Sequence, residues 1–222
     1  MGRHNFTYFY ILRFLHLSDL KLAISGRILD VGCGVGGLAL YLCRYAKQVV
    51  GIDVSTRAIK IARQAAKHNQ VSNVYFAVQK MTVQKNNYDL IMATEVIEHI
   101  QNDQKFLQNI YASLKKSGYL LLSTPSVNSL MYHWGWYEEF DHQVGHLRRY
   151  TAQDLSQLLR QIGFKVVTLS ERESLLRSIL FTTKLGFLIR FIRGPLVYLF
   201  HFVDEIFGYV FGFTDIIILA KK

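Results

Sequence analysis

The chain has 222 residues, which is enough for one domain with a full hydrophobic core but not comfortably enough for two. Half of the residues are hydrophobic and the net charge is +10, yet Lys and Arg are dispersed in short pairs such as Lys115-Lys116, which argues against a nucleic-acid-binding arm. The two cysteines, Cys33 and Cys43, exclude a disulfide framework and are typical of a reducing, cytoplasmic compartment.

The predicted elements alternate from residue 27 onward. Residues 1–25 precede them and contain an apolar run. Because Arg13 and His16 interrupt this run, we expect a leading lid helix here and not a signal peptide. The predicted strands are 27–31, 48–53, 73–78, 88–94, 118–124, 165–169 and 213–222. The predicted helices are 37–47, 56–69, 104–114 and 151–162. This order predicts a single α/β domain with a Rossmann-like, seven-stranded, mostly parallel sheet and helices on both faces.

A glycine-rich loop follows the first predicted strand. Gly32, Gly34 and Gly36 permit a tight turn and a close approach of the backbone to a ligand. Asp53 ends the next strand, where a carboxylate can accept both hydroxyls of a ribose. Asp30 precedes the glycines and would repel a pyrophosphate but attract the cationic groups of S-adenosylmethionine (SAM). The loop therefore predicts a SAM site.

An alternative prediction is left open by the spacing of Gly32, Gly34 and Gly37. These glycines also satisfy the GxGxxG pattern of an NAD(P)-dependent oxidoreductase, although that pattern is weak by itself. A third possibility is a binding protein that keeps the SAM fold without catalysis.

Four segments carry a resemblance to a known family: ILDVGCGVGG (28–37), VVGIDVS (49–55), YDLIMATEVIEHI (88–100) and LKKSGYLLLSTP (114–125). Over roughly residues 25–170 the chain resembles the class I SAM-dependent methyltransferases, particularly the small-molecule branch that includes the ubiquinone-biosynthesis O-methyltransferases. The resemblance implies strand order 3-2-1-4-5-7-6 with the last strand antiparallel. It also implies that Gly32, Gly34 and Gly36 line the methionine end of SAM, that Asp53 holds the ribose, and that Thr94 lies near the cofactor.

The segment after the third strand departs from that family. Many relatives have an acid there that binds the adenine amino group, whereas residues 78–82 contain none. Gln79 could accept the same hydrogen bond, and Met81 could pack on the adenine ring.

Two loops supply candidates for catalysis. Glu95, Glu98 and His99 follow the fourth strand, and in the ubiquinone O-methyltransferases the corresponding residues are thought to hold a divalent metal. We expect no metal here and keep Mg²⁺ at these three residues as the less favoured alternative, with Glu98 and His99 also counted as catalytic candidates. In the second loop, 131–150, His146 is the preferred general base and His142 the second choice.

A hydrophobic helical insertion, residues 174–212, precedes the last strand. Its charges and the break at Gly194-Pro195 predict two short amphipathic helices rather than a membrane span. Aromatic and aliphatic residues flanked by arginines favour peripheral contact with the inner face of a membrane, and hence a small or lipid-linked methyl acceptor. The alternative is a helical pair packed on the sheet or against a homodimer partner.

Overall fold

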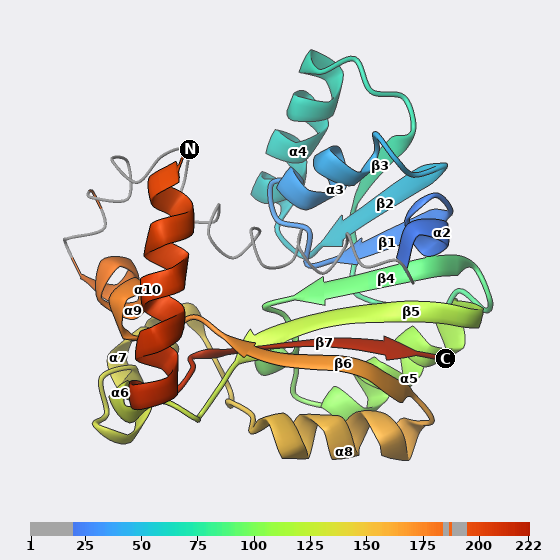
Figure 1. Ribbon diagram of the computed structural model, residues 1–222. Coiled ribbons are helices and arrows are strands. Elements are labelled where there is room, and N and C mark those ends of the chain that lie inside the picture. Colours follow the sequence, from blue (N-terminus) through green and yellow to red (C-terminus); the bar gives the residue numbers. More distant parts are fainter. Residues whose placement is uncertain (1–19, 184–186, 188–194) are drawn as a thin grey trace.

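The computed structural model describes residues 20–183, 187 and 195–222 (Figure 1). Seven strands form one sheet with the order β3-β2-β1-β4-β5-β7-β6. The strands are β1 (Arg27–Val31), β2 (Gln48–Asp53), β3 (Val74–Val78), β4 (Tyr88–Thr94), β5 (Leu114–Pro125), β6 (Lys165–Arg172) and β7 (Asp215–Lys221). β7 alone runs opposite to the other strands, so its pairings with β5 and β6 are antiparallel, and its arrow in Figure 1 points against that of β5. The predicted fold class, strand order and reversed last strand are confirmed.

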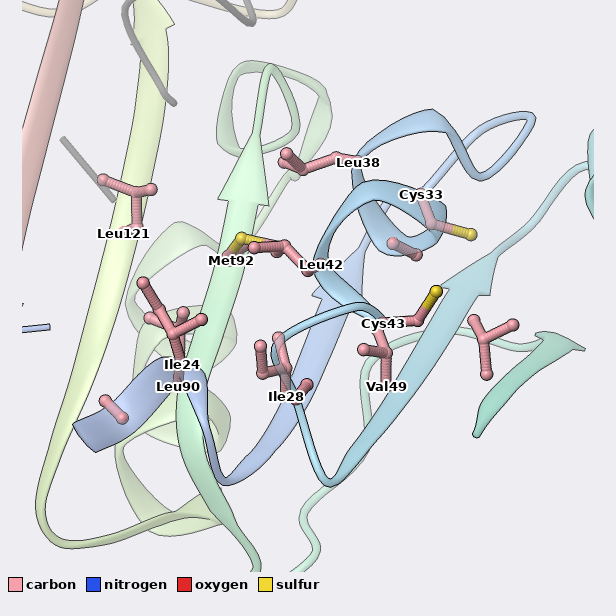
Figure 2. Close-up of a cluster of buried hydrophobic side chains, with 14 of the residues drawn as sticks. Ile24, Ile28, Cys33, Leu38, Leu42, Cys43, Val49, Leu90, Met92 and Leu121 are labelled. Atoms are coloured by element: carbon pink, nitrogen blue, oxygen red, sulfur yellow. The ribbon is translucent and has the colours of Figure 1, made fainter. Parts of the chain in front are cut away.

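Helices cover both faces of the sheet and create two hydrophobic cores. Helices α2 (Lys21–Ile24), α3 (Gly37–Leu42) and α4 (Thr56–His68) contribute to one core, and α5 (Asp103–Ser113) and α8 (Ala152–Ile162) to the other. Figure 2 shows the first core, where apolar side chains of α3 gather over those of β4. Because β4 is buried on both faces, its sequence is apolar almost throughout, as expected of a central parallel strand.

Several element boundaries differ from the prediction. The helix predicted over 37–47 ends at Leu42, because the side-chain amide of Asn73 donates to the carbonyls of Cys43 and Ala46, at 2.7 and 2.9 Å, and so caps the end of the helix. β5 begins at Leu114, four residues early, because Leu114 pairs with Tyr88. The predicted helix over 3–25 lies mostly outside the described residues.

The segment after β5 was expected to be a loop, and this prediction was wrong. It contains helices α6 (Leu130–His133) and α7 (Glu138–Val144). Three acids in the first turn of α7 favour its formation through the helix dipole, and Gly145, with φ +79°, ends the helix in the left-handed conformation that glycine adopts without strain.

The insertion before the last strand is helical over most of the part that the structure describes. Helices α9 (Leu175–Thr182) and α10 (Pro195–Phe211) stand beyond the carboxyl ends of β4 and β5, at the left of Figure 1. Arg190 and Arg193, two of the arginines on which the expected membrane contact rests, lie outside the described residues. Within the part of the chain that is described, no helix has the length and apolar character needed to cross a membrane.

Candidate functional site

The glycine loop between β1 and α3 leaves an open cradle at the carboxyl edge of the sheet. Gly32 and Gly34 have φ values of +69° and +53°, a region that favours glycine. A side chain at Gly32 would meet Val96 at 2.4 Å, whereas the space beside Gly34 is open to 4 Å. Gly36 serves packing instead, since a Cβ there would meet the Phe76 ring at 2.6 Å.

Two carboxylates flank this loop in different environments. Asp53 accepts from the backbone N–H groups of Gly34, at 2.9 Å, and Ser55, at 2.8 Å, so each of its oxygens is oriented by one backbone donor. Asp30 is buried, and among the described residues its Oδ2 has no hydrogen-bond partner. Burial and the charge of Asp53 raise the pKa of Asp30 to about 7. A cationic ligand at the loop would favour the ionised form of both.

A cavity of about 870 Å³ opens over the loop, and half of the residues predicted to bind the cofactor line it. Gly32, Asp53, Gln79 and Met81 line it. The amide nitrogen of Gln79 donates to Thr82 at 3.0 Å, an orientation compatible with the prediction that the amide oxygen accepts from an adenine amino group. The other four predicted residues, Asp30, Gly34, Gly36 and Thr94, do not line this cavity.

A second cavity, of about 310 Å³, adjoins the first. Glu95 and His99 line both, so the two cavities meet at the loop after β4. Glu95 has a positive φ of +56° and accepts from Ser123 Oγ at 2.6 Å. Burial raises the pKa of this carboxyl well above its usual value. The smaller cavity is also lined by His146 and by groups from α7, α9 and the start of β7.

Three side-chain acceptors lie close together beside the cavities: His99 lines both cavities, His146 lines the smaller one, and Glu98 is buried behind them and lines neither. Oε1 of Glu98 lies 3.9 Å from Nε2 of His99 and 4.0 Å from Nε2 of His146. The second oxygen of Glu98 accepts from Thr124 at 2.9 Å, while Oε1 is buried without a hydrogen-bond partner among the described residues. Burial raises the pKa of Glu98 to about 7.

The geometry does not favour the magnesium site that was kept as an alternative. Among the described residues, the cluster with metal-ligand spacing is Glu98, His99 and His146, whose ligand atoms lie within 4.8 Å of one another. Glu95 is not part of it. Mg²⁺ prefers six oxygen ligands, whereas this cluster supplies one carboxylate and two imidazoles. The donor set does not fit Mg²⁺.

The second histidine candidate is not brought to the site. His142 lies on an exposed face of α7 and lines neither cavity, although its neighbours Phe140 and Val144 line the smaller one. Residues that the sequence did not single out complete that cavity, among them Tyr137, Arg149 and Asp215. Because α7 was not predicted, no sequence pattern indicated which residues of 131–150 would face inward.

Fold and site together define the class of SAM-dependent methyltransferases, because dinucleotide-binding sheets of the oxidoreductase type have the order 3-2-1-4-5-6 without an inserted antiparallel strand. A family model described as a methyltransferase domain matches residues 3–169, and the chain belongs to this family. SAM is therefore the cofactor indicated for the larger cavity, and the prediction of a SAM-dependent methyltransferase is confirmed at the level of family and fold.

Individual relatives agree with this assignment. The chain is 33% identical over 115 residues to the ubiquinone biosynthesis O-methyltransferase of Pelagibacter ubique, an alignment covering 49% of this chain and 48% of that protein. It thus spans about half the length of the curated relatives it matches. A SAM-dependent methyltransferase from Mesorhizobium loti has a similar fold, with a TM-score of 0.70, 14% identity and full coverage of both chains.

Similarity of fold alone does not fix the reaction. The cyclase SpnF is similar with a TM-score of 0.64 and 24% identity, covering 88% of this chain and 75% of that one. The chemistry has to be argued from the residues of the site.

Proposed function

We propose that this protein transfers the methyl group of SAM to a hydroxyl oxygen of an amphipathic, lipid-linked acceptor at a membrane surface. The observation that carries this proposal is the junction of two cavities at Glu95 and His99, with His146 in the smaller one. The larger cavity has the glycine loop and Asp53 that suit the adenosine and methionine parts of SAM. The smaller cavity then holds the acceptor.

The residues at the junction suit an oxygen nucleophile. The acceptor oxygen bonds to the methyl carbon of SAM as the carbon–sulfur bond breaks, the electron pair stays on sulfur, and the hydroxyl proton passes to Nε2 of His146. His99, which lines both cavities, is placed to orient the hydroxyl, and the buried Glu98, with Oε1 4.0 Å from Nε2 of His146, is placed to accommodate the charge that develops on His146. Because the displacement is in line, positioning of the two reactants contributes much of the rate.

The outward face of α10 supports a membrane-associated acceptor. His201 and Asp204 face inward and are 5% and 1% exposed, whereas Phe202 and Tyr209 are 62% and 78% exposed. This arrangement is the reverse of a normal surface helix, which buries its apolar side. The exposed apolar residues recur at helical spacing and are Leu196, Leu199, Phe202, Ile206, Tyr209 and Val210.

Helix α9 connects this apolar face to the acceptor cavity. Arg177 and Ser178 of α9 line the smaller cavity. The carboxylate of Asp204 on α10 accepts from the backbone N–H groups of Ser174, at 2.9 Å, and Arg177, at 3.1 Å, and so caps α9. An acceptor could therefore keep an apolar tail in the lipid beside α10 and place its polar head beneath α9.

The curated relatives are consistent with such an acceptor, since they are named for O-methylation in ubiquinone biosynthesis. The outward face of α10 could alternatively be covered by a second copy of the chain in a homodimer. Apolar area of this kind marks either sort of interface, and the vesicle experiment described in the Discussion separates them.

The direct test is transfer of label from methyl-tritiated SAM to an organic extract of membrane lipids. Wild-type protein should place the label in the lipid fraction. The His146→Ala variant should lose about 10²–10⁴-fold in turnover while keeping its affinity for SAM, because it loses the proton acceptor but none of the larger cavity.

The matched control is His142→Ala, which removes an exposed imidazole from the same segment and should retain turnover. Full activity of His146→Ala would contradict the proposed chemistry. SAM binding without any transfer of label by the wild-type protein would favour a non-catalytic protein.

A further inference from the structure

A hydrogen bond defines which nitrogen of His146 is basic. Nδ1 of His146 lies 2.8 Å from Oδ1 of Asp141. An ionised carboxylate can only accept, so Nδ1 carries the hydrogen and Nε2 keeps its lone pair. Nε2 lies 4.0 Å from Oε1 of the buried Glu98, and His146 lines the smaller cavity.

Asp141 is itself held by Arg149. The guanidinium donates to Oδ2 of Asp141 from Nε and to Oδ1 from Nη2, both at 2.7 Å. It also donates to the carbonyl of Ser126 at 3.3 Å and lies 4.3 Å from the centre of the Tyr137 ring. Because the Arg149 side chain is only 4% exposed, this two-point contact is shielded from water and fixes the orientation of the carboxylate.

The backbone anchors the same pair of residues. The N–H groups of Gly145 and His146 both donate to the carbonyl of Asp141 at 2.9 Å, at the left-handed turn that ends α7. His146 is thus tied to Asp141 through its backbone and through its ring. Few rotations remain by which the imidazole could turn Nε2 away from the cavity.

Building on the proposed function, we propose that Asp141 is the positioning residue that keeps Nε2 of His146 as the proton acceptor, and that Arg149 holds Asp141 in place for this role. The imidazolium that forms when the hydroxyl proton reaches Nε2 is stabilised by the adjacent carboxylate. Burial by itself would raise the pKa of Asp141, but hydrogen bonds from Arg149 and His146 lower it to about 2, so Asp141 stays ionised throughout.

The test exchanges the carboxylate for an amide. In Asp141→Asn the amide nitrogen can donate to Nδ1 of His146, which would move the ring hydrogen to Nε2 and remove the basic lone pair from the cavity. We expect kcat for label transfer to the lipid extract to fall about 10²–10³-fold, with the apparent KM values for SAM and extract changed less than about twofold. Nitrogen-15 NMR of labelled histidine should report the change of tautomer at His146 directly.

The matched control is Asp89→Asn. Asp89 also pairs with a cation, Lys115 at 2.7 Å, and accepts from the backbone N–H of Arg27, but it lies at the opposite end of β4 and lines neither cavity. It should leave kcat and the His146 tautomer unchanged. The conservative variant Asp141→Glu, which can still accept from Nδ1, should recover part of the lost kcat.

Three outcomes would overturn the proposal. These are an unchanged kcat in Asp141→Asn, a lower kcat with the wild-type tautomer retained, and a wild-type protein in which Nε2 of His146 binds a stoichiometric transition-metal ion. Failure of the proposed function is distinguishable, because the wild-type protein would then transfer no label to the extract. The NMR measurement needs no turnover, so it reports the tautomer that Asp141 imposes on His146 whether or not the protein transfers label.

Discussion

Asp30 and Asp53 lie in different environments although both flank the same glycine loop. Asp53 is partly exposed and its oxygens are fixed by backbone donors, so it is prepared to bind hydroxyl groups. Asp30 is buried with an oxygen that lacks a partner among the described residues, which makes its ionised form costly without a nearby cation. A positively charged donor such as SAM relieves that cost, whereas a pyrophosphate would increase it.

This difference predicts a pH-dependent stability for the protein without SAM. Burial and Asp53 raise the pKa of Asp30 from 3.8 to about 7, so the stability that the protonated form contributes is lost as pH rises through that range. Asp30→Asn stays neutral, and its free energy of unfolding should therefore gain about 2–3 kcal/mol on the wild type between pH 5 and pH 8, because the folded and unfolded states differ in protonation over about two pH units of that interval at ~1.4 kcal/mol per unit. Urea denaturation at both pH values measures this. If the free energies of unfolding of Asp30→Asn and the wild type differ by the same amount at pH 5 and pH 8, the raised pKa of Asp30 is contradicted.

Single residues were predictable from sequence where a local motif specifies them. Gly32 and Asp53 sit at fixed positions in a strand–loop–helix–strand unit, and both line the larger cavity. Asp141 and Arg149 have no such motif, because the contact between them depends on the turn at Gly145. His146 was predicted as the general base, but the residues that hold its ring were not predicted.

Among the elements, α10 has two faces whose orientation the sequence did not predict. Asp204 is buried as the cap of α9, and Glu205 forms an ion pair with Arg172 of β6. These inward polar contacts turn the apolar side toward solvent. Hydrophobic periodicity identifies two faces of a helix but not which of them is buried, and here tertiary hydrogen bonds decide.

The exposed face of α10 predicts binding to lipid vesicles. Phe202→Glu combined with Tyr209→Glu should lower partitioning into vesicles that contain anionic lipid by at least about tenfold, since two apolar side chains no longer enter the interface. Flotation of the protein with such vesicles measures this. Ile61→Glu, on the exposed side of α4, is the matched control and should float like the wild type.

Unchanged flotation of the double variant would contradict membrane contact through α10. A wild-type dimer that this variant converts to a monomer, with flotation unchanged, would show instead that a second copy covers the face.

The central strands were predictable because burial on both faces gives a plain apolar signal. β1, β2 and β4 have the predicted bounds. The end of α3 was not predictable, since a side chain from residue 73, thirty residues away, caps it. α7 was missed despite two local signals, the acids at its start and the glycine at its end, because residues 131–150 were taken to be a loop whose aromatic and histidine side chains serve the site.

At the scale of the whole molecule, the fold places two adjoining cavities at one edge of the sheet. The loops after β1, β2, β3 and β4 line the larger cavity, and the chain after β5 with α7 and α9 lines the smaller one. The loop after β4 lines both cavities, and in the proposed function Glu95 and His99 therefore lie between the methyl donor and the acceptor. Ligands in open parallel sheets bind at this edge, so the location of the site followed from the strand order.

The account depends above all on SAM binding at the glycine loop, and calorimetry tests this most directly. SAM and its demethylated product should each bind the wild-type protein saturably. Both should bind Asp53→Ala at least about tenfold more weakly, because this variant loses the ribose acceptor, and both should bind His146→Ala with wild-type affinity. NAD should give no heat. A wild-type protein that binds NAD, or that binds neither SAM nor its product, would contradict the account.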